Sequence, residues 1–205
     1  WMGSKPGGLY RLKSMSDGNQ YKVDRIAGLS NSNVYDIAED RWGRLWIATL
    51  GGGICCVDNP SADRPRILKP SAYLKGYPKR LAQKVRMIYI TKDNVLLAAT
   101  TDGLLISRLK NGEDTKNMVF RCHTREAGRK DALSCSATMN IVEDSKGRLF
   151  ISTESGGINM IASKDITGER LSFKHFGKAD GLPTDVLLSV TNCGKKLLLV
   201  GNNSI

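Results

Sequence analysis

An internal repeat with a period near 50 residues constrains this chain more than any other feature. Residues 29–49 (LSNSNVYDIAEDRWGRLWIAT) align without a gap to residues 133–153 (LSCSATMNIVEDSKGRLFIST). Three more divergent copies occupy residues 1–12, 81–100 and 182–202. One apolar position anchors all five copies, at Trp1, Trp46, Leu97, Phe150 and Leu199, with steps of 45, 51, 53 and 49 residues. A fixed period of this length is typical of stacked repeat architectures.

Within one copy the pattern is that of short β-strands. Residues 34–39 (VYDIAE) alternate apolar and polar side chains, a polar turn follows, and residues 45–49 (LWIAT) form a second apolar run. Glycines 51–53 predict another turn, and residues 54–57 (ICCV) a third strand. A more variable fourth strand is expected at residues 21–26, 66–69, 119–124 and 171–176.

Four short antiparallel strands in each repeat predict an all-β fold, a β-propeller in which each sheet forms one blade. A single sheet of this kind exposes an apolar face, so each blade must pack on its neighbours. We expect the anchoring residues to lie in the blade core: Trp1, Trp46, Leu97, Phe150 and Leu199.

The predicted β-propeller fragment has about four blades and forms an arc of a larger ring of about seven blades. The end of one blade, three complete blades and the start of another are expected at residues 1–26, 27–69, 81–124, 133–176 and 182–205. The two terminal pieces would compete for the same second-strand position, which disfavours a closed four-bladed ring. Neither an initiator Met nor a leader precedes Trp1, so we expect a piece of a longer protein.

Three segments resemble the two-component regulator propeller repeat: WMGSKPGGLYRL, GLSNSNVYDIAEDRWGRLWIATLGGGICCVD and ALSCSATMNIVEDSKGRLFISTESGGINMI. The pattern of that family has a Gly-Leu lead, Glu-Asp before a glycine turn, then Leu-Trp-(Ile/Phe)-Gly-Thr and Gly-Gly-(Ile/Leu). Ala48 and Ser152 replace its glycine, and residues 81–106 lack the Glu-Asp pair and the aromatic residue. These departures make the regularity of the blade at 81–124 doubtful.

The resemblance implies similarity to the periplasmic sensor region of hybrid two-component histidine kinases from bacteria that digest polysaccharides. It implies ligand sensing by about fourteen blades in two rings, an oligosaccharide signal, and regulation of polysaccharide use. A membrane helix, a kinase and a phosphorelay would follow in the parent polypeptide. The sequence holds no phospho-acceptor histidine motif, ATP-binding glycine box or receiver aspartate cluster. The chain itself is therefore not expected to be an enzyme.

Loops on one face of the propeller are the candidate ligand site. In a propeller, the turn before the innermost strand and the turn between the second and third strands share one face. Small polar side chains on such loops suit sugar hydroxyls, although for any single one of them ordinary solvated turn chemistry is the better explanation. The candidate ligand-binding residues are Asn31, Asn33, Lys79, Arg80, Lys84, Arg86, Asp102 and Glu154.

The net charge of +11 favours anionic partners. Residues 64–92 hold nine basic residues and no acidic one, together with Tyr73 and Tyr77. Arginine pairs with carboxylates and sulfates, and tyrosine can stack on a sugar ring, so this stretch favours an acidic oligosaccharide. A solvated basic loop without a ligand is the open alternative. Nucleic acid is disfavoured, because no stacking motif accompanies the charge.

Five cysteines without CxxC spacing, and His123 far from His175 in sequence, predict neither a metal site nor a disulfide framework, and no cofactor is expected. Two other functions stay open: a protein-interaction scaffold, and a propeller enzyme such as a polysaccharide lyase or sialidase. The enzyme would need an acid–base set near the axis, whereas both histidines fall on predicted outer strands. Expected partners are an oligosaccharide, further blades and the kinase region of the same polypeptide, and a second copy in a homodimer.

Overall fold

The computed structural model describes residues 1–15, 20–70, 76–78, 80–194 and 196–201, and it is an all-β structure of five antiparallel sheets. Three sheets have four strands, joined in sequence order. The first sheet has three strands and the last has two. Two short 3-10 helices, η1 (Gly112–Asn117) and η2 (Lys178–Asp180), lie in the connections.

The strands have the following bounds. The first sheet consists of β1 (Met2–Ser4), β2 (Gly8–Ser14) and β3 (Tyr21–Ile26). The second consists of β4 (Val34–Glu39), β5 (Leu45–Thr49), β6 (Gly53–Val57) and β7 (Ile67–Leu68). The third consists of β8 (Val85–Ile90), β9 (Val95–Thr100), β10 (Leu104–Arg108) and β11 (Phe120–His123). The fourth consists of β12 (Thr138–Glu143), β13 (Leu149–Thr153), β14 (Ile158–Ile161) and β15 (Phe173–Phe176), and the fifth of β16 (Leu187–Cys193) and β17 (Lys196–Gly201).

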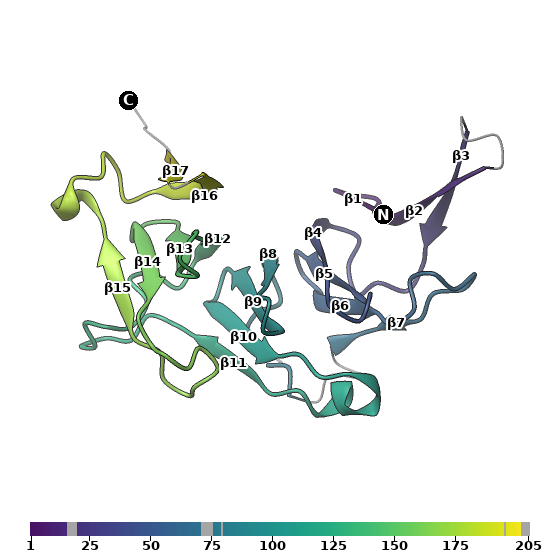
Figure 1. Ribbon diagram of the computed structural model, residues 1–205, viewed down its shortest axis with the longest axis horizontal. Helices are drawn as coiled ribbons and strands as arrows, with labels where there is room; N and C mark the ends of the chain where they lie inside the picture. The colour runs from purple at the N-terminus through teal and green to yellow at the C-terminus, as the bar shows by residue number, and fades with distance from the viewer. Residues whose placement is uncertain (16–19, 71–75, 79, 195, 202–205) are drawn as a thin grey trace.

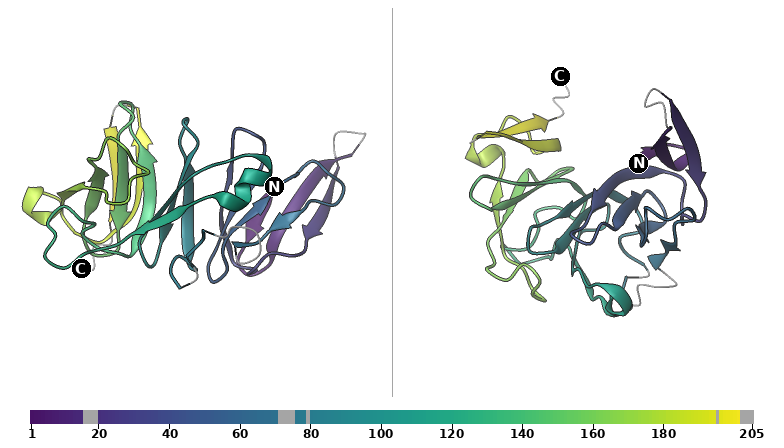
Figure 2. Two further views of the ribbon diagram at one scale, coloured as in Figure 1. Left: turned by 90° about the horizontal axis from the view of Figure 1, so that it is seen from below. Right: turned by 45° about the vertical axis from the view of Figure 1, so that its right-hand side comes forward.

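The five sheets lie side by side in an open arc (Figure 1). Strands β4, β8, β12 and β16 lie on its concave side, each in contact with the next, and β7, β11 and β15 lie outside. The sheets stand face to face along the arc, and its two ends do not meet (Figure 2). Strand β1 contacts β4 just as β5 contacts β8 and β13 contacts β16, so β1 occupies a second-strand position. The prediction of a propeller fragment is confirmed, whereas the number of blades in a complete ring stays a prediction.

In each of the three four-stranded sheets, one polar side chain holds the turn that follows the inner strand. Asp40 accepts hydrogen bonds from Trp42 N (3.0 Å), Arg44 N (3.1 Å), Arg44 Nε (2.8 Å) and Trp46 Nε1 (2.8 Å). Asp144 holds the matching turn of the fourth sheet. In the third sheet Thr91 Oγ1 accepts from Val95 N (3.1 Å), and Asn94 adopts the positive φ (58°) that Gly43 has elsewhere (76°). Loss of the Glu-Asp pair therefore leaves this blade regular, because another residue set builds the turn.

Apolar clusters fill the spaces between neighbouring sheets. Trp46 packs between the second and third sheets, Leu97 between the third and fourth, and Phe150 between the fourth and fifth, and all three are buried. Trp1 differs from this expectation, since it is 36% exposed. The indole of Trp46, in contrast, donates a hydrogen bond to Asp40 Oδ2 (2.8 Å). Leu199 lies on β17, but its side chain is outside the described part of the structure.

The inner strands are linked by side chains that point from one sheet to the next. Each inner strand has an irregularity in register at its start, near Asp36, Met87, Asn140 and Ser189. Asp36 Oδ2 accepts a hydrogen bond from Ile88 N (2.8 Å), and Asn140 Oδ1 accepts one from Val190 N (3.4 Å). An inner strand has no ladder partner on its axis side, so these acceptors satisfy N–H groups that would otherwise lack one.

Replacement of Asp36 tests this link. Burial raises the pKa of the Asp36 carboxyl, while the N–H groups of Ile88 and Ile37 partly oppose that rise. We expect Asp36→Leu to lower the free energy of unfolding by about 1–3 kcal/mol, because Ile88 N–H loses its acceptor. Asp36→Asn keeps an acceptor, as Asn140 does in the fourth sheet, and should match or exceed the wild type at pH 7. Urea unfolding of both variants measures the difference.

The pH dependence gives a second readout of the same variants. The folded-state pKa of Asp36 is higher than the unfolded one, so ionisation disfavours the fold as pH rises between the two values. Asp36→Asn should gain stability relative to the wild type as pH rises through that window. Equal losses in Asp36→Asn and Asp36→Leu at pH 7 would contradict the hydrogen-bond account.

Candidate functional site

One face of the arc is built from the turns that follow the second strands. A threonine ends each second strand of the complete sheets, and its hydroxyl donates to the carbonyl oxygen of a glycine at or directly before the start of the third strand. The pairs are Thr49 with Gly53 (2.8 Å), Thr100 with Gly103 (2.8 Å) and Thr153 with Gly157 (2.9 Å). The same hydroxyls accept a turn N–H, so each turn is fixed in one geometry. Loops on this face are thus presented by a rigid scaffold.

These turns also bond to the loop that precedes the next inner strand. Gly51 N and Gly53 N donate to Gln83 O (2.9 and 2.8 Å), and Gly157 N donates to Asp185 O (2.8 Å). Within the fourth sheet, a Cβ at Gly156 would lie 2.4 Å from Ser134 Oγ, so the close approach of these two loops requires glycine. The two kinds of loop therefore share one face, as the sequence predicts.

Two of the candidate ligand residues meet on this face. Arg86, on β8, donates from Nη1 to Thr138 O (3.2 Å), and its Nη2 lies 3.5 Å from Glu154 Oε2. Glu154 follows β13 and is mostly exposed. The pair joins the third and fourth sheets, so a large part of the Arg86 guanidinium already serves the contact between blades.

The other candidates are separated along the face. Asn31 Oδ1 accepts from Asn33 N (2.8 Å) in a local turn, and Asp102 Oδ2 accepts from Ala82 N (3.0 Å). Arg80 and Lys84 are exposed. Lys79, Tyr73 and Lys75 lie outside the described residues. Tyr77, expected to be available for stacking on a sugar, is buried instead, because its ring packs edge-on against Phe120 at 5.1 Å.

A cavity of about 280 Å³, here called the first corner, lies beside Asn31. It is lined by Gly7, Gly8, Arg25, Ile26, Ala27, Gly28, Leu29, Asn31 and Ser32. Arg25 is the next-to-last residue of strand β3, near the connection to β4, and its Nε donates to Gly7 O (3.1 Å). Arg25 is not among the residues expected from the sequence; its place one residue before the end of the strand that leads into a loop of the ligand face was the available signal.

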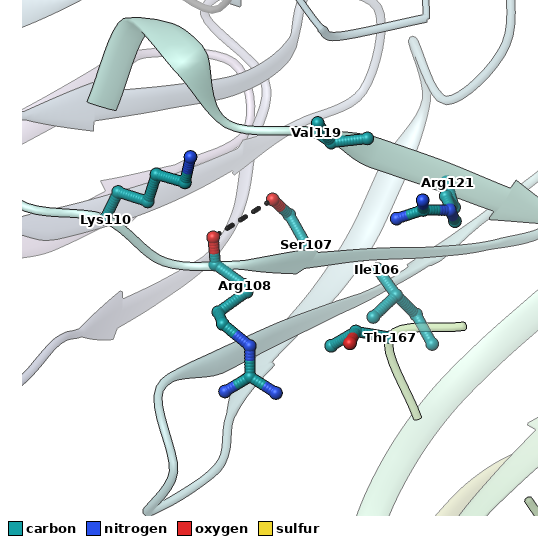
Figure 3. Close-up of a pocket in the computed structure, with 7 residues that line it drawn as sticks. All are labelled: Ile106, Ser107, Arg108, Lys110, Val119, Arg121 and Thr167. Carbon is teal, nitrogen blue, oxygen red and sulfur yellow. Dashed lines mark hydrogen bonds between the residues drawn. The ribbon is translucent and has the colours of Figure 1, made fainter. Parts of the chain in front are cut away.

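A second cavity, of about 100 Å³, lies at the outer strands and was also not predicted (Figure 3). Its lining residues are Ile106, Ser107, Arg108, Lys110, Val119, Arg121 and Thr167. The three cationic ends point in different directions (Figure 3). Arg108 Nη1 reaches Asp93 O (3.5 Å), and Arg121 lies 3.8 Å from Glu169. These cations do not converge on one point, so the cavity is a poor anion site.

Both histidines lie on outermost strands. His123 is on β11, where burial lowers its pKa, and His175 is on β15, with Nε2 2.6 Å from Ala132 O. Neither is placed to act as an acid or base near the inner strands. Among the described side chains, no three metal-ligating residues gather in one place.

Comparisons with known proteins agree with this geometry. The family model of the two component regulator propeller matches residues 28–51. The extracellular domain of the putative hybrid two component system BT3049 from B. thetaiotaomicron superposes with a TM-score of 0.63 and 20% identity, covering 89% of this chain and 23% of that chain. The corresponding domain of BT4673 from the same organism gives 0.63 and 21%, covering 83% and 22%.

The fold is also shared with an enzyme. A virginiamycin B lyase from Staphylococcus aureus, in a catalytically inactive form with quinupristin, gives a TM-score of 0.59 and 13% identity, covering 94% of this chain and 56% of that chain. No curated protein matches the sequence. At these identities the likeness concerns the fold, and the chain spans less than a quarter of the hybrid-system domains. The chain is thus a β-propeller fragment that carries a two-component regulator propeller repeat at residues 28–51.

Proposed function

We propose that this chain is part of the extracytoplasmic, ligand-sensing propeller of a hybrid two-component signal transduction protein. The observation that carries the proposal is the regulator propeller repeat at residues 28–51, within a fold shared with extracellular domains of putative hybrid two component systems. The parent polypeptide would supply the remaining blades, a sensor histidine kinase and its phosphorelay, with this segment in the periplasm. In the described part of the chain, no helix is long and apolar enough to span a membrane.

The proposed signal is an oligosaccharide, with acidic sugars favoured and polysaccharide utilisation as the regulated process. The net charge of +11 and the exposed Arg80 and Lys84 on the loop face support an anionic ligand. Polar turn residues such as Asn33 and Ser155 suit sugar hydroxyls. This proposal needs no catalytic residue and no cofactor.

Signalling requires that the ligand bind one arrangement of the propeller better than another. The loop face is cross-linked between blades by Arg86 with Glu154, and by the glycines of residues 51–53 with Gln83. A ligand held by loops of two neighbouring blades would therefore favour one relative placement of those blades. We propose that this preference passes to the kinase region through the rest of the propeller or through a second copy of the protein.

An interaction scaffold is the second candidate. The outer face of the first sheet exposes Met2, Leu12 and Val23, each at 43–55%, and such an apolar face can pack against a further blade or against another protein. A lyase-like activity is less supported, because both histidines lie on outer strands.

Binding of acidic sugars can be measured by calorimetric titration of the chain with hexasaccharides of galacturonate and of glucose. We expect tighter binding of the galacturonate hexamer, weakening as salt rises. Lys84→Gln should lower that affinity about threefold, since it removes one exposed charge. Lys146→Gln, in an exposed turn at the opposite end of its sheet, is the matched control. Equal affinities for both sugars without salt dependence would contradict an acidic ligand.

The cellular side of the proposal is tested by protease accessibility of the native parent protein. With the outer membrane permeabilised and the inner membrane intact, added protease should remove an epitope placed in the exposed loop around residue 128. A kinase-region epitope on the same protein should survive until the inner membrane is lysed. Protection of both epitopes in intact spheroplasts would argue against an extracytoplasmic sensor.

A further inference from the structure

We propose that the first corner is a binding site for one pyranose ring that carries a carboxylate, that is, a hexuronate unit. The proposal rests on the proposed oligosaccharide-sensing function and gives it a location. It is carried by a comparison of the four equivalent corners inside this chain, each formed where a second-to-third-strand turn meets the connection to the next blade.

The four corners are marked by equivalent glycines: Gly8, Gly53, Gly103 and Gly157. A Cβ at Gly103 would lie 2.4 Å from His123 O, and one at Gly157 would lie 2.2 Å from Phe176 O. The outer strand itself therefore closes the third and fourth corners. A Cβ built at Gly8 meets no atom within 4 Å, so the first corner is open at the same position.

The second corner shows what this position can hold. A Cβ at Gly53 would lie 2.9 Å from Tyr77 Oη and 3.1 Å from Tyr77 Cε1, so the phenol ring occupies the space beside the glycine. The ring is buried, and its hydroxyl donates to Ala82 O at 2.5 Å. This corner of the fold thus accommodates a six-membered ring whose hydroxyl bonds to a backbone carbonyl.

The difference between the two corners follows from the length of the connection. Residues 69–84 join β7 to β8 and bring Tyr77 back over the turn. Residues 27–33 join β3 to β4, which leaves only seven residues. The short connection passes beside the turn without filling it, and the cavity of about 280 Å³ remains.

The lining of the first corner indicates the chemistry of the occupant. Ile26 and Leu29 provide apolar surface, while Ser32 and Asn31 provide polar groups, as sugar-binding pockets need. Arg25 is the one charged residue among the lining residues, and its bond from Nε to Gly7 O holds the guanidinium at the edge of the cavity. A guanidinium pairs with a carboxylate through two parallel hydrogen bonds, so a uronate fits better than a neutral sugar.

The experiment is an NMR titration of the ¹⁵N-labelled chain with methyl β-glucuronide and methyl β-glucoside. We expect the glucuronide to shift the amide signals of Gly7, Gly8 and Gly28. Arg25→Gln should weaken glucuronide binding about tenfold, as expected for a charged hydrogen-bond pair, while glucoside binding stays unchanged. Lys146→Gln, the same loss of charge away from the face, should change neither titration.

A second variant imitates the occupied corner. Ala27 is exposed at the rim, and Ala27→Trp should fill the cavity with a ring as Tyr77 does in the second corner. We expect it to abolish the shifts at Gly7 and Gly8 with the amide spectrum otherwise unchanged. If this variant does not fold, Arg25→Gln still decides the proposal.

Other outcomes distinguish a failure of the proposed hexuronate site from a failure of the proposed sensing function. Glucuronide shifts around Lys84 and Arg86 in place of the first corner would overturn the site and leave the acidic-sugar proposal standing. Equal weakening of both sugars by Arg25→Gln would overturn carboxylate recognition. Absence of shifts with either sugar would overturn the site, whereas the sensor role is decided separately by protease accessibility.

Discussion

The structure depends on the need of each small sheet to bury two apolar faces. In the second sheet, Ile47 and Val57 face the first sheet, while Trp46 and Ile54 face the third, and all four are fully buried. An isolated four-stranded sheet would leave both of these faces in water, at a cost of roughly 25 cal/mol for each Å² exposed. Stacking is therefore the condition for each blade to fold.

Polar groups fix how the stacked sheets sit on one another. Asp36 and Asn140 satisfy N–H groups of the next inner strand, and the carbonyl of Gln83 accepts from the turn at Gly51 and Gly53. Different residues form equivalent turns: Thr91 and Asn94 form in the third sheet the turn that Asp40 and Gly43 form in the second. The scaffold therefore tolerates divergence between repeats, and its loops are free to differ in length. The variation in connection length is what leaves one corner open and another filled by Tyr77.

Part of the candidate site followed from sequence reasoning. Alternation of apolar residues and paired glycines predicted the strands, the turns and the common face of the loops, because these are local properties. The same reasoning placed Tyr77 at the surface as a sugar platform and did not single out Arg25. A propensity pattern carries no information on which side chain of a long loop turns back onto the preceding blade. Trp1 was likewise expected in the core, because it matches Trp46 in the repeat, but it is 36% exposed.

The sequence by itself determined the repeat, the strand order within each blade and the need for blades to stack, since these follow from periodicity and from burial of apolar side chains. Only the tertiary structure decided which polar residues are already used between blades, as Arg86 is with Glu154, and which remain available. Only it distinguished the open first corner from the three closed ones. Such differences arise from contacts between residues tens of positions apart, whose distances are set by the packing of whole sheets.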